Sequence, residues 1–140
     1  MTAADNKNLV LSLFASAASG DRARFTDTLA DDLIMRVTGA NSWSRTYKGK
    51  REYLDILHGH LNTLLKPNRR TVPLNFWADG EHVIVEARGE MEHKNGTPYR
   101  NEYCLVFRLR DGRIVEFREY MDSALCEQVL GRFPTGHGAE

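Results

Sequence analysis

The sequence predicts a single α+β domain in which an antiparallel sheet curls over a layer of helices. Two observations predict this class. The first half of the 140-residue chain carries apolar residues at helical spacing, and the second half carries strand-like runs separated by hairpin turn signals. Helices segregated from an antiparallel sheet are typical of α+β proteins. No repeat or linker interrupts the pattern, so we expect one domain over residues 1–140.

The first half of the chain is predicted to be mostly helical. Apolar residues fall on one face of a helix over residues 5–18, and a second helix is expected over about 21–30. A short strand over 33–37 follows. Residues 38–50 are rich in Gly, Ser, Asn and Thr, which is typical of a loop. A stripe of leucines then predicts a third helix over about 50–65.

The second half is predicted to be a four-stranded antiparallel meander. Dipeptides that favour tight hairpins occur in order along it: Asp79-Gly80, Asn95-Gly96 and Asp111-Gly112. They separate strand-like runs over about 70–78, 82–93, 99–110 and 113–121. A last helix is expected over 123–131, and residues 132–140 are expected to be a disordered tail. The predicted order is therefore α-α-β-α-β-β-β-β-α.

The central strands have apolar residues on both faces. In the runs over 82–93 and 99–110, each face carries aliphatic or aromatic side chains. One face can pack on the helices, and the other then needs cover from water. A partner sheet is the simplest cover, so we expect a homodimer. Long strands curled over three helices also form a cone with an open mouth, which suits a small hydrophobic molecule.

Composition excludes several classes of protein. Nineteen Lys and Arg balance nineteen Asp and Glu, which argues against nonspecific nucleic-acid binding. No apolar run approaches the roughly 20 residues of a membrane span, and residues 1–8 resemble no secretory signal. The two cysteines, Cys104 and Cys126, are too few for a disulfide scaffold. We therefore expect a cytoplasmic protein with no nucleic-acid or membrane partner.

Motifs for metals, nucleotides and serine hydrolysis are missing from the sequence. His58 and His60 are two residues apart on a predicted helix, so they point about 200° apart and cannot hold one metal ion. No Cys/His spacing resembles a zinc site, and no P-loop, GxGxxG or GxSxG occurs. We expect neither a metal nor a cofactor.

Four charged residues are candidates for catalysis. Arg88 and Glu90 alternate on one face of a predicted strand, and Glu119 lies on a strand that could sit nearby. They could form an acid/base pair steered by a guanidinium, or a solvated face with cross-strand ion pairs. Asp122 directly precedes the last predicted helix. It could be an acid in the pocket or the N-cap of that helix.

Four aromatic residues are candidates for ligand binding. Trp43 and Tyr47 lie in the predicted loop before the third helix, where they could line the mouth of the cone or pin the loop to the core. Tyr103 and Phe14 could also line the pocket, with plain core packing as the alternative.

Several runs carry a resemblance to a known family. These are PYRNEYCLVFRLRDGRIV over 98–115, FREYMD over 117–122, ADD over 30–32 and YKGK over 47–50. With the element order, they resemble the SnoaL-like branch of the nuclear-transport-factor-2-like (NTF2-like) superfamily over about residues 5–131. The resemblance implies a cone-shaped fold. The superfamily holds ketosteroid isomerases, limonene-epoxide hydrolases, polyketide cyclases, dehydratases and binding modules, so function must come from the site.

The positions that carry ketosteroid isomerase activity in that superfamily hold different chemistry here. The matching positions are Leu13, Val37 and Leu105. None of these side chains can accept or donate a proton. The resemblance therefore does not extend to steroid isomerisation.

The epoxide-hydrolase pattern is retained in part. Arg88-Gly89-Glu90 and the later Glu119 resemble that family's carboxylate–guanidinium–carboxylate set, with Glu in place of Asp. Met35 and Val37 stand where its water-holding Tyr and Asn would be. The longer Glu moves a carboxylate by more than about 1 Å, which can greatly slow a reaction. In polyketide cyclases a carboxylate on the last strand is the acid/base group, and Glu119 or Asp122 matches it.

The sequence therefore predicts a SnoaL-like enzyme that binds a small hydrophobic molecule in an enclosed pocket. The expected chemistry is cofactor-free acid/base isomerisation, cyclisation or hydrolysis. The alternative is a noncatalytic small-ligand binding module of the same fold.

Overall fold

The computed structural model describes residues 1–134 of the chain. Of the tail that was predicted to be disordered, residues 132–134 are described and 135–140 lie outside the described residues. Phe133 is buried, and its ring centroid lies 4.9 Å from that of Trp43. The chain past the last helix thus continues along the body of the protein at least as far as Phe133.

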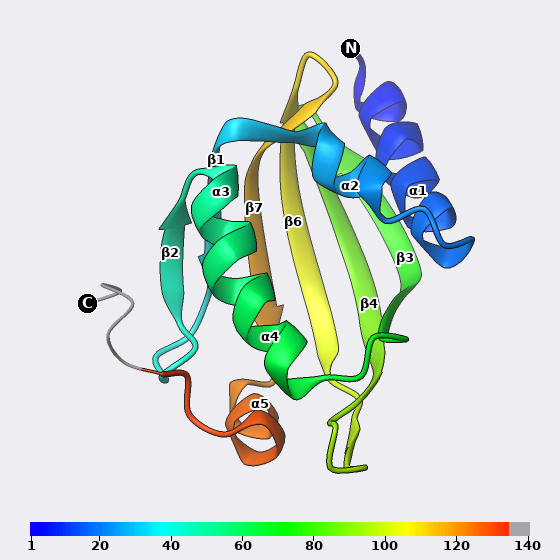
Figure 1. Cartoon of the computed structure of the whole chain (residues 1–140). Coiled ribbons are helices and arrows are strands. Elements are labelled where there is room, and N and C mark those ends of the chain that lie inside the picture. The colour runs from blue at the N-terminus through cyan, green and yellow to red at the C-terminus, as the bar shows by residue number, and fades with distance from the viewer. Residues whose placement is uncertain (135–140) are drawn as a thin grey trace.

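One curved sheet forms the wall of the molecule (Figure 1). Its strands are β1 (Leu29–Val37), β2 (Arg45–Lys48), β3 (Arg70–Asp79), β4 (His82–Glu92), β5 (Pro98–Tyr99), β6 (Glu102–Arg110) and β7 (Arg113–Met121). Their order in space is β2-β1-β7-β6-β4-β3, and β5 pairs with β4. The predicted antiparallel meander is confirmed as β3-β4-β6-β7. Beyond it, β1 pairs with β7 in parallel.

The helices cover the concave face and one end of the sheet (Figure 1). They are α1 (Ala3–Ala18), α2 (Ala23–Thr28), a run of α3 (Lys50–Glu52), the π-helix η1 (Tyr53–His58) and α4 (Gly59–Leu64), and α5 (Ser123–Leu130). A capping box starts α1, because the Thr2 hydroxyl accepts from the Asp5 amide while the Asp5 carboxylate accepts from the Thr2 amide. The α+β class and the cone-like arrangement are therefore as predicted.

Two segments of the chain differ from their predicted structure, and each contains a short strand. Residues 38–50, predicted to be a loop, contain β2, in which Arg45 and Tyr47 are buried and the residues between and after them are exposed. This alternation spans only four residues, too few to stand out among polar neighbours. The predicted strand over 99–110 is broken after β5, because the buried side chain of Asn101 takes over hydrogen bonds that a ladder would supply.

The hairpin turns test the dipeptide signals directly. Asp111 and Gly112 both have positive φ, of 52° and 76°, as a two-residue turn between β6 and β7 requires. In the β3–β4 hairpin, Asp79 instead pairs with His82, so that Gly80 and Glu81 occupy the centre of the turn. The third dipeptide, Asn95-Gly96, lies in the connection between the antiparallel strands β4 and β5. The signal thus located all three turns, and the β3–β4 turn lies one residue later than predicted.

The alternation of β4 separates the two faces of the sheet. Val83, Val85 and Ala87 are buried toward the helices, and the intervening Glu86 and Arg88 are exposed on the outer face. Within the described residues, no helix has the length and apolar character needed to cross a membrane.

Candidate functional site

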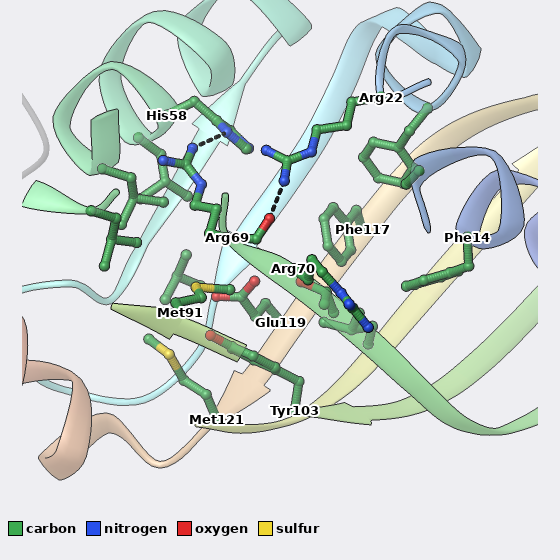
Figure 2. Close-up of a pocket in the computed structure, with 18 of the residues that line it drawn as sticks. Phe14, Arg22, His58, Arg69, Arg70, Met91, Tyr103, Phe117, Glu119 and Met121 are labelled. Carbon is green, nitrogen blue, oxygen red and sulfur yellow. Dashed lines mark hydrogen bonds between the residues drawn. The ribbon is translucent and has the colours of Figure 1, made fainter. Parts of the chain in front are cut away.

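A cavity of about 440 Å³ lies between the concave face of the sheet and the helices. Its walls are mainly aliphatic and aromatic, and several polar groups interrupt them. The polar or ionisable side chains in the lining are Arg22, Thr26, Trp43, Tyr53, His58, Arg69, Arg70, Thr71, Tyr99, Tyr103, Glu119 and Cys126. Figure 2 shows part of this lining.

Glu119 is the sole carboxylate among the described residues that line the cavity. It lies on β7 between Phe117 and Met121, which also line the cavity, so the inward alternation of the strand places it there. In the sheet it is flanked by Val37 of β1 and Leu105 of β6. No side chain within residues 1–134 forms a hydrogen bond or ion pair with its carboxylate.

This environment disfavours the ionised form of Glu119. Burial raises the pKa of Glu119 from its ordinary value of 4.5 to about 7. Glu119 is partly buried, and it lines the cavity. A carboxyl group with a pKa near 7 can both accept and release a proton at neutral pH.

A chain of hydrogen bonds orients Tyr53 at the opposite wall. In η1, hydrogen bonds span five residues and bring Tyr53 and His58 together; the Tyr53 hydroxyl is 2.9 Å from His58 Nε2. Arg69 Nη2 lies 3.4 Å from His58 Nδ1 (Figure 2). Burial, and then the charges of Arg69 and Arg22, lower the pKa of His58 to about 4, so the imidazole is neutral at pH 7.

The hydrogen-bond pattern assigns the tautomer of His58. A guanidinium can only donate, so Nδ1 is the acceptor and Nε2 carries the proton. Nε2–H then donates to the Tyr53 hydroxyl oxygen. The hydroxyl hydrogen of Tyr53 is left free for an acceptor in the cavity.

Tyr103 and Phe14 line the cavity, as the sequence predicts, although their binding role stays a prediction. Burial, followed by the charge of Glu119, raises the pKa of the Tyr103 hydroxyl. Gly89 leaves room for this ring: a Cβ on Gly89 would lie only 3.2 Å from Tyr103 Cε2. Tyr103 is thereby held as a neutral hydrogen-bond donor near Glu119.

The structure does not bring Arg88 and Glu90 together with Glu119. Both lie on the outer face of the sheet, where Arg88 Nη2 is 3.2 Å from Glu90 Oε2. Glu90 is also 3.6 Å from Arg70 Nη2. The alternative of a solvated face with ion pairs therefore describes this strand, because the alternation of β4 directs its apolar residues inward.

Asp122 is the N-cap of α5. Its side chain accepts a hydrogen bond of 3.1 Å from the Leu125 amide. Asp122 is not among the residues that line the cavity. Of the two alternatives for this residue, the structure shows the cap.

Trp43 and Tyr47 are both buried, but they lie differently. Trp43 borders the cavity while its indole N–H donates to the Gly131 carbonyl at 2.8 Å, which pins the segment to the end of α5. Tyr47 is absent from the cavity lining, and the Arg45 guanidinium lies 4.5 Å from the centre of its ring. Trp43 thus combines both predicted roles, and Tyr47 is a core residue.

The sequence analysis missed Tyr53 and Arg22, set His58 aside and gave Arg69 no role in a site. The spacing of Tyr53 and His58, five residues apart, gives no signal in an ordinary α-helix. Arg22 and Arg69 lie in separate connections between elements, which only the fold brings to one cavity. Among residues 1–134, no group of three His, Cys, Asp or Glu side chains gathers in a way that could hold a metal ion.

Comparisons with known proteins agree with this architecture. A sequence model of the SnoaL-like domain matches residues 10–117. The uncharacterized protein YesE of Bacillus subtilis (strain 168) is 33% identical over 78 residues, which are 51% of this chain and 46% of YesE. The matched region is thus about half the length of that relative.

Solved structures that share the fold include the following two. An NTF2-like protein from Burkholderia pseudomallei has a TM-score of 0.75 at 21% identity, over 89% of this chain and 96% of that one. An LEH-like epoxide hydrolase from M. tuberculosis has a TM-score of 0.69 at 20% identity, over 91% of this chain and 90% of that one. At such identities the likeness shows the fold and not the activity. With a domain match over most of its length and this shared fold, the chain belongs to the SnoaL-like domain family.

Proposed function

We propose that the protein is a cofactor-independent acid/base enzyme that acts on a small hydrophobic molecule, with Glu119 as the group that transfers the proton. One observation carries the proposal: the single carboxyl group in the described lining lies in a largely apolar cavity, and its pKa is raised to about 7. Perturbed carboxyl groups in clefts are typical of catalytic sites. Isomerisation, cyclisation and hydrolysis all use such a group.

The chemistry begins with the ionised carboxylate. Glu119 removes a proton from a carbon next to a carbonyl group, and the electron pair of the broken C–H bond moves toward the carbonyl oxygen. Tyr53 and Tyr103 line the same cavity and can donate hydrogen bonds to the resulting enolate oxygen. The protonated Glu119 then returns its proton to another atom of the intermediate, so no net proton is gained or lost.

Proton exchange in D₂O tests the proposal without knowledge of the natural substrate. A panel of small cyclic ketones such as 2-tetralone is incubated with the enzyme, and loss of the proton next to the carbonyl is followed by NMR. We expect wild-type exchange to depend on a group with an apparent pKa near 7. Glu119→Gln should slow exchange by about 100-fold or more.

Matched controls separate catalysis from binding. Glu86→Gln and Glu90→Gln make the same change on the outer face and should leave exchange unaltered. If Glu119→Gln exchanges as fast as the wild type, the acid/base proposal fails. A chain that binds these ketones without exchange would instead be the noncatalytic binding module.

Two further expectations remain proposals. The free thiols of Cys104 and Cys126 are compatible with a reducing compartment, and we keep the cytoplasm as the proposed location. Leu13, Val37 and Leu105 all line the cavity, so the positions that match those used by ketosteroid isomerases face the cavity here but carry no ionisable group. We expect no turnover of a 5-ene-3-ketosteroid.

A further inference from the structure

The open side of the cavity carries three arginines. Arg22 directly precedes α2, Arg69 directly precedes β3, and Arg70 is the first residue of that strand. Arg22 and Arg70 are exposed, whereas Arg69 is partly buried. Figure 2 shows the three arginines and Glu119 around this pocket. The described lining is therefore cationic where its arginines reach solvent, and Glu119 on the sheet is the one acid in it.

Within the part of the chain that the structure describes, two of these arginines have no anionic partner. Arg70 has Glu90 at 3.6 Å, but no carboxylate within residues 1–134 pairs with Arg22 or Arg69. Arg22 donates instead to the carbonyl oxygen of Arg69, and Arg69 contacts the neutral His58. Burial, followed by the charge of Arg22, lowers the pKa of Arg69. Two guanidinium groups are therefore held near each other with no counter-charge among the described residues.

An anion would relieve this arrangement. A guanidinium presents a planar fork of donors that matches an oxyanion, and such charge-assisted hydrogen bonds are strong where water is partly excluded. Arg22 is exposed and remains solvated, so Arg69 is the charge that most lacks compensation. A monoanion neutralises one partly buried positive charge, whereas a dianion such as a phosphate monoester would bring a second negative charge with it. The site therefore favours a monoanion.

We propose that the ligand is a small hydrophobic acid whose carboxylate binds Arg69 and Arg22 at the mouth and whose apolar body extends into the cavity toward Glu119. The inference rests on the proposed function only in using the same cavity, and it adds the class of ligand. The neutral lining beyond the mouth accepts the apolar body, and the protonated form of Glu119 does not repel it.

Matched acids and amides test this ligand class. Binding of benzoate, cinnamate and 2-naphthoate is compared by calorimetry with that of benzamide, cinnamamide and 2-naphthamide at pH 7. We expect at least one acid to bind the wild type about tenfold or more tightly than its amide, the size of one charge-assisted contact. Arg69→Met should abolish that preference without weakening the amide, and Arg69→Lys should retain part of it.

Three control variants test whether Arg69 is the residue that gives the preference for acids. Arg70→Met, at a residue already paired with Glu90, and Arg88→Met on the outer face should retain the preference. Glu119→Gln should also retain it, so failure of the acid/base chemistry and failure of this inference are distinguishable. Equal binding of acids and amides, a preference that survives Arg69→Met, or no binding of any acid at millimolar concentration would overturn the proposal. Tighter binding of 2-naphthyl phosphate than of 2-naphthoate would overturn the choice of a carboxylate.

Discussion

Glu119 and His58 are two partly buried ionisable residues whose titrations oppose each other. The pKa of Glu119 is raised from 4.5 to about 7, so between these values the folded state holds more protons and stability falls as pH rises. The pKa of His58 is lowered from 6.5 to about 4, so the folded state holds fewer protons there and stability rises with pH. The two windows overlap between pH 4.5 and 6.5, where the effects offset each other.

Single substitutions should separate the contributions of Glu119 and His58 to the pH dependence of stability. The free energy of unfolding of Glu119→Gln, relative to the wild type at the same pH, should increase by about 1–3 kcal/mol from pH 4 to pH 8. For His58→Gln the relative value should decrease over the same range. Urea unfolding at several pH values measures both differences. Glu86→Gln on the exposed face should show neither trend, and flat differences for both partly buried residues would contradict the argument.

Two tyrosines on neighbouring elements differ in one hydrogen bond. The hydroxyl of Tyr47 is buried with no hydrogen-bond partner among the described residues, and burial raises the pKa of Tyr47 to about 12. The hydroxyl of Tyr53 pairs with His58. Tyr47→Phe should therefore be neutral or stabilising, and Tyr53→Phe should destabilise by about 1 kcal/mol. Chemical denaturation of both variants at pH 7 tests the contrast, and equal losses would refute it.

At the scale of elements, Asn101 joins the break between β5 and β6 to the start of α5. Its Nδ2 donates to the Asp122 carbonyl and to the Tyr99 hydroxyl, each at 2.9 Å. Its Oδ1 accepts from the Asp122 amide at 3.0 Å and from the Glu102 amide at 2.8 Å. A fully buried side chain thus holds three segments together, which no periodicity in the sequence could indicate.

Loss of that side chain should cost more than loss of the adjacent cap. Asn101→Ala leaves buried backbone donors and acceptors without hydrogen-bond partners. We expect the free energy of unfolding to fall by about 3 kcal/mol. Asp122→Ala removes the N-cap of α5 but keeps the backbone bonds to Asn101, and should cost about 1 kcal/mol. Thermal and urea unfolding compare the two variants. A cap substitution as damaging as Asn101→Ala would show that Asn101 does not hold the junction.

The elements that local chemistry specifies were the ones the sequence could predict. Asp111-Gly112 sets a turn through its own backbone preferences, and α1 follows from its apolar face and ends. Neither β2 nor η1 has such a local signature, since β2 is short and a π-helix has the composition of an α-helix. Tertiary packing decides both.

At the scale of the whole molecule, the sequence likewise predicts some properties of the site residues but not those that depend on tertiary packing. Alternation predicts that Arg88 and Glu90 share a face, but not which face turns toward the helices. Glu119 could be placed on the last strand, yet its isolation follows from walls contributed by distant elements. The cationic mouth is likewise a product of topology, because Arg22 and Arg69 meet only after the chain has folded.

The remaining prediction is a homodimer that forms through the outer face of the sheet. Trp77 pairs across strands with Ile84, and Ile84 with Val106, which gives an apolar row on the face opposite the cavity. Trp77 is 50% exposed in the single chain. Light scattering at micromolar concentration should give twice the 15.9 kDa of one chain. Trp77→Lys should shift the mass toward one chain, because it places a charge within an apolar contact. Leu11→Lys, at an exposed leucine on α1, should leave the dimer intact. A wild type of single-chain mass would show that this face stays in contact with water.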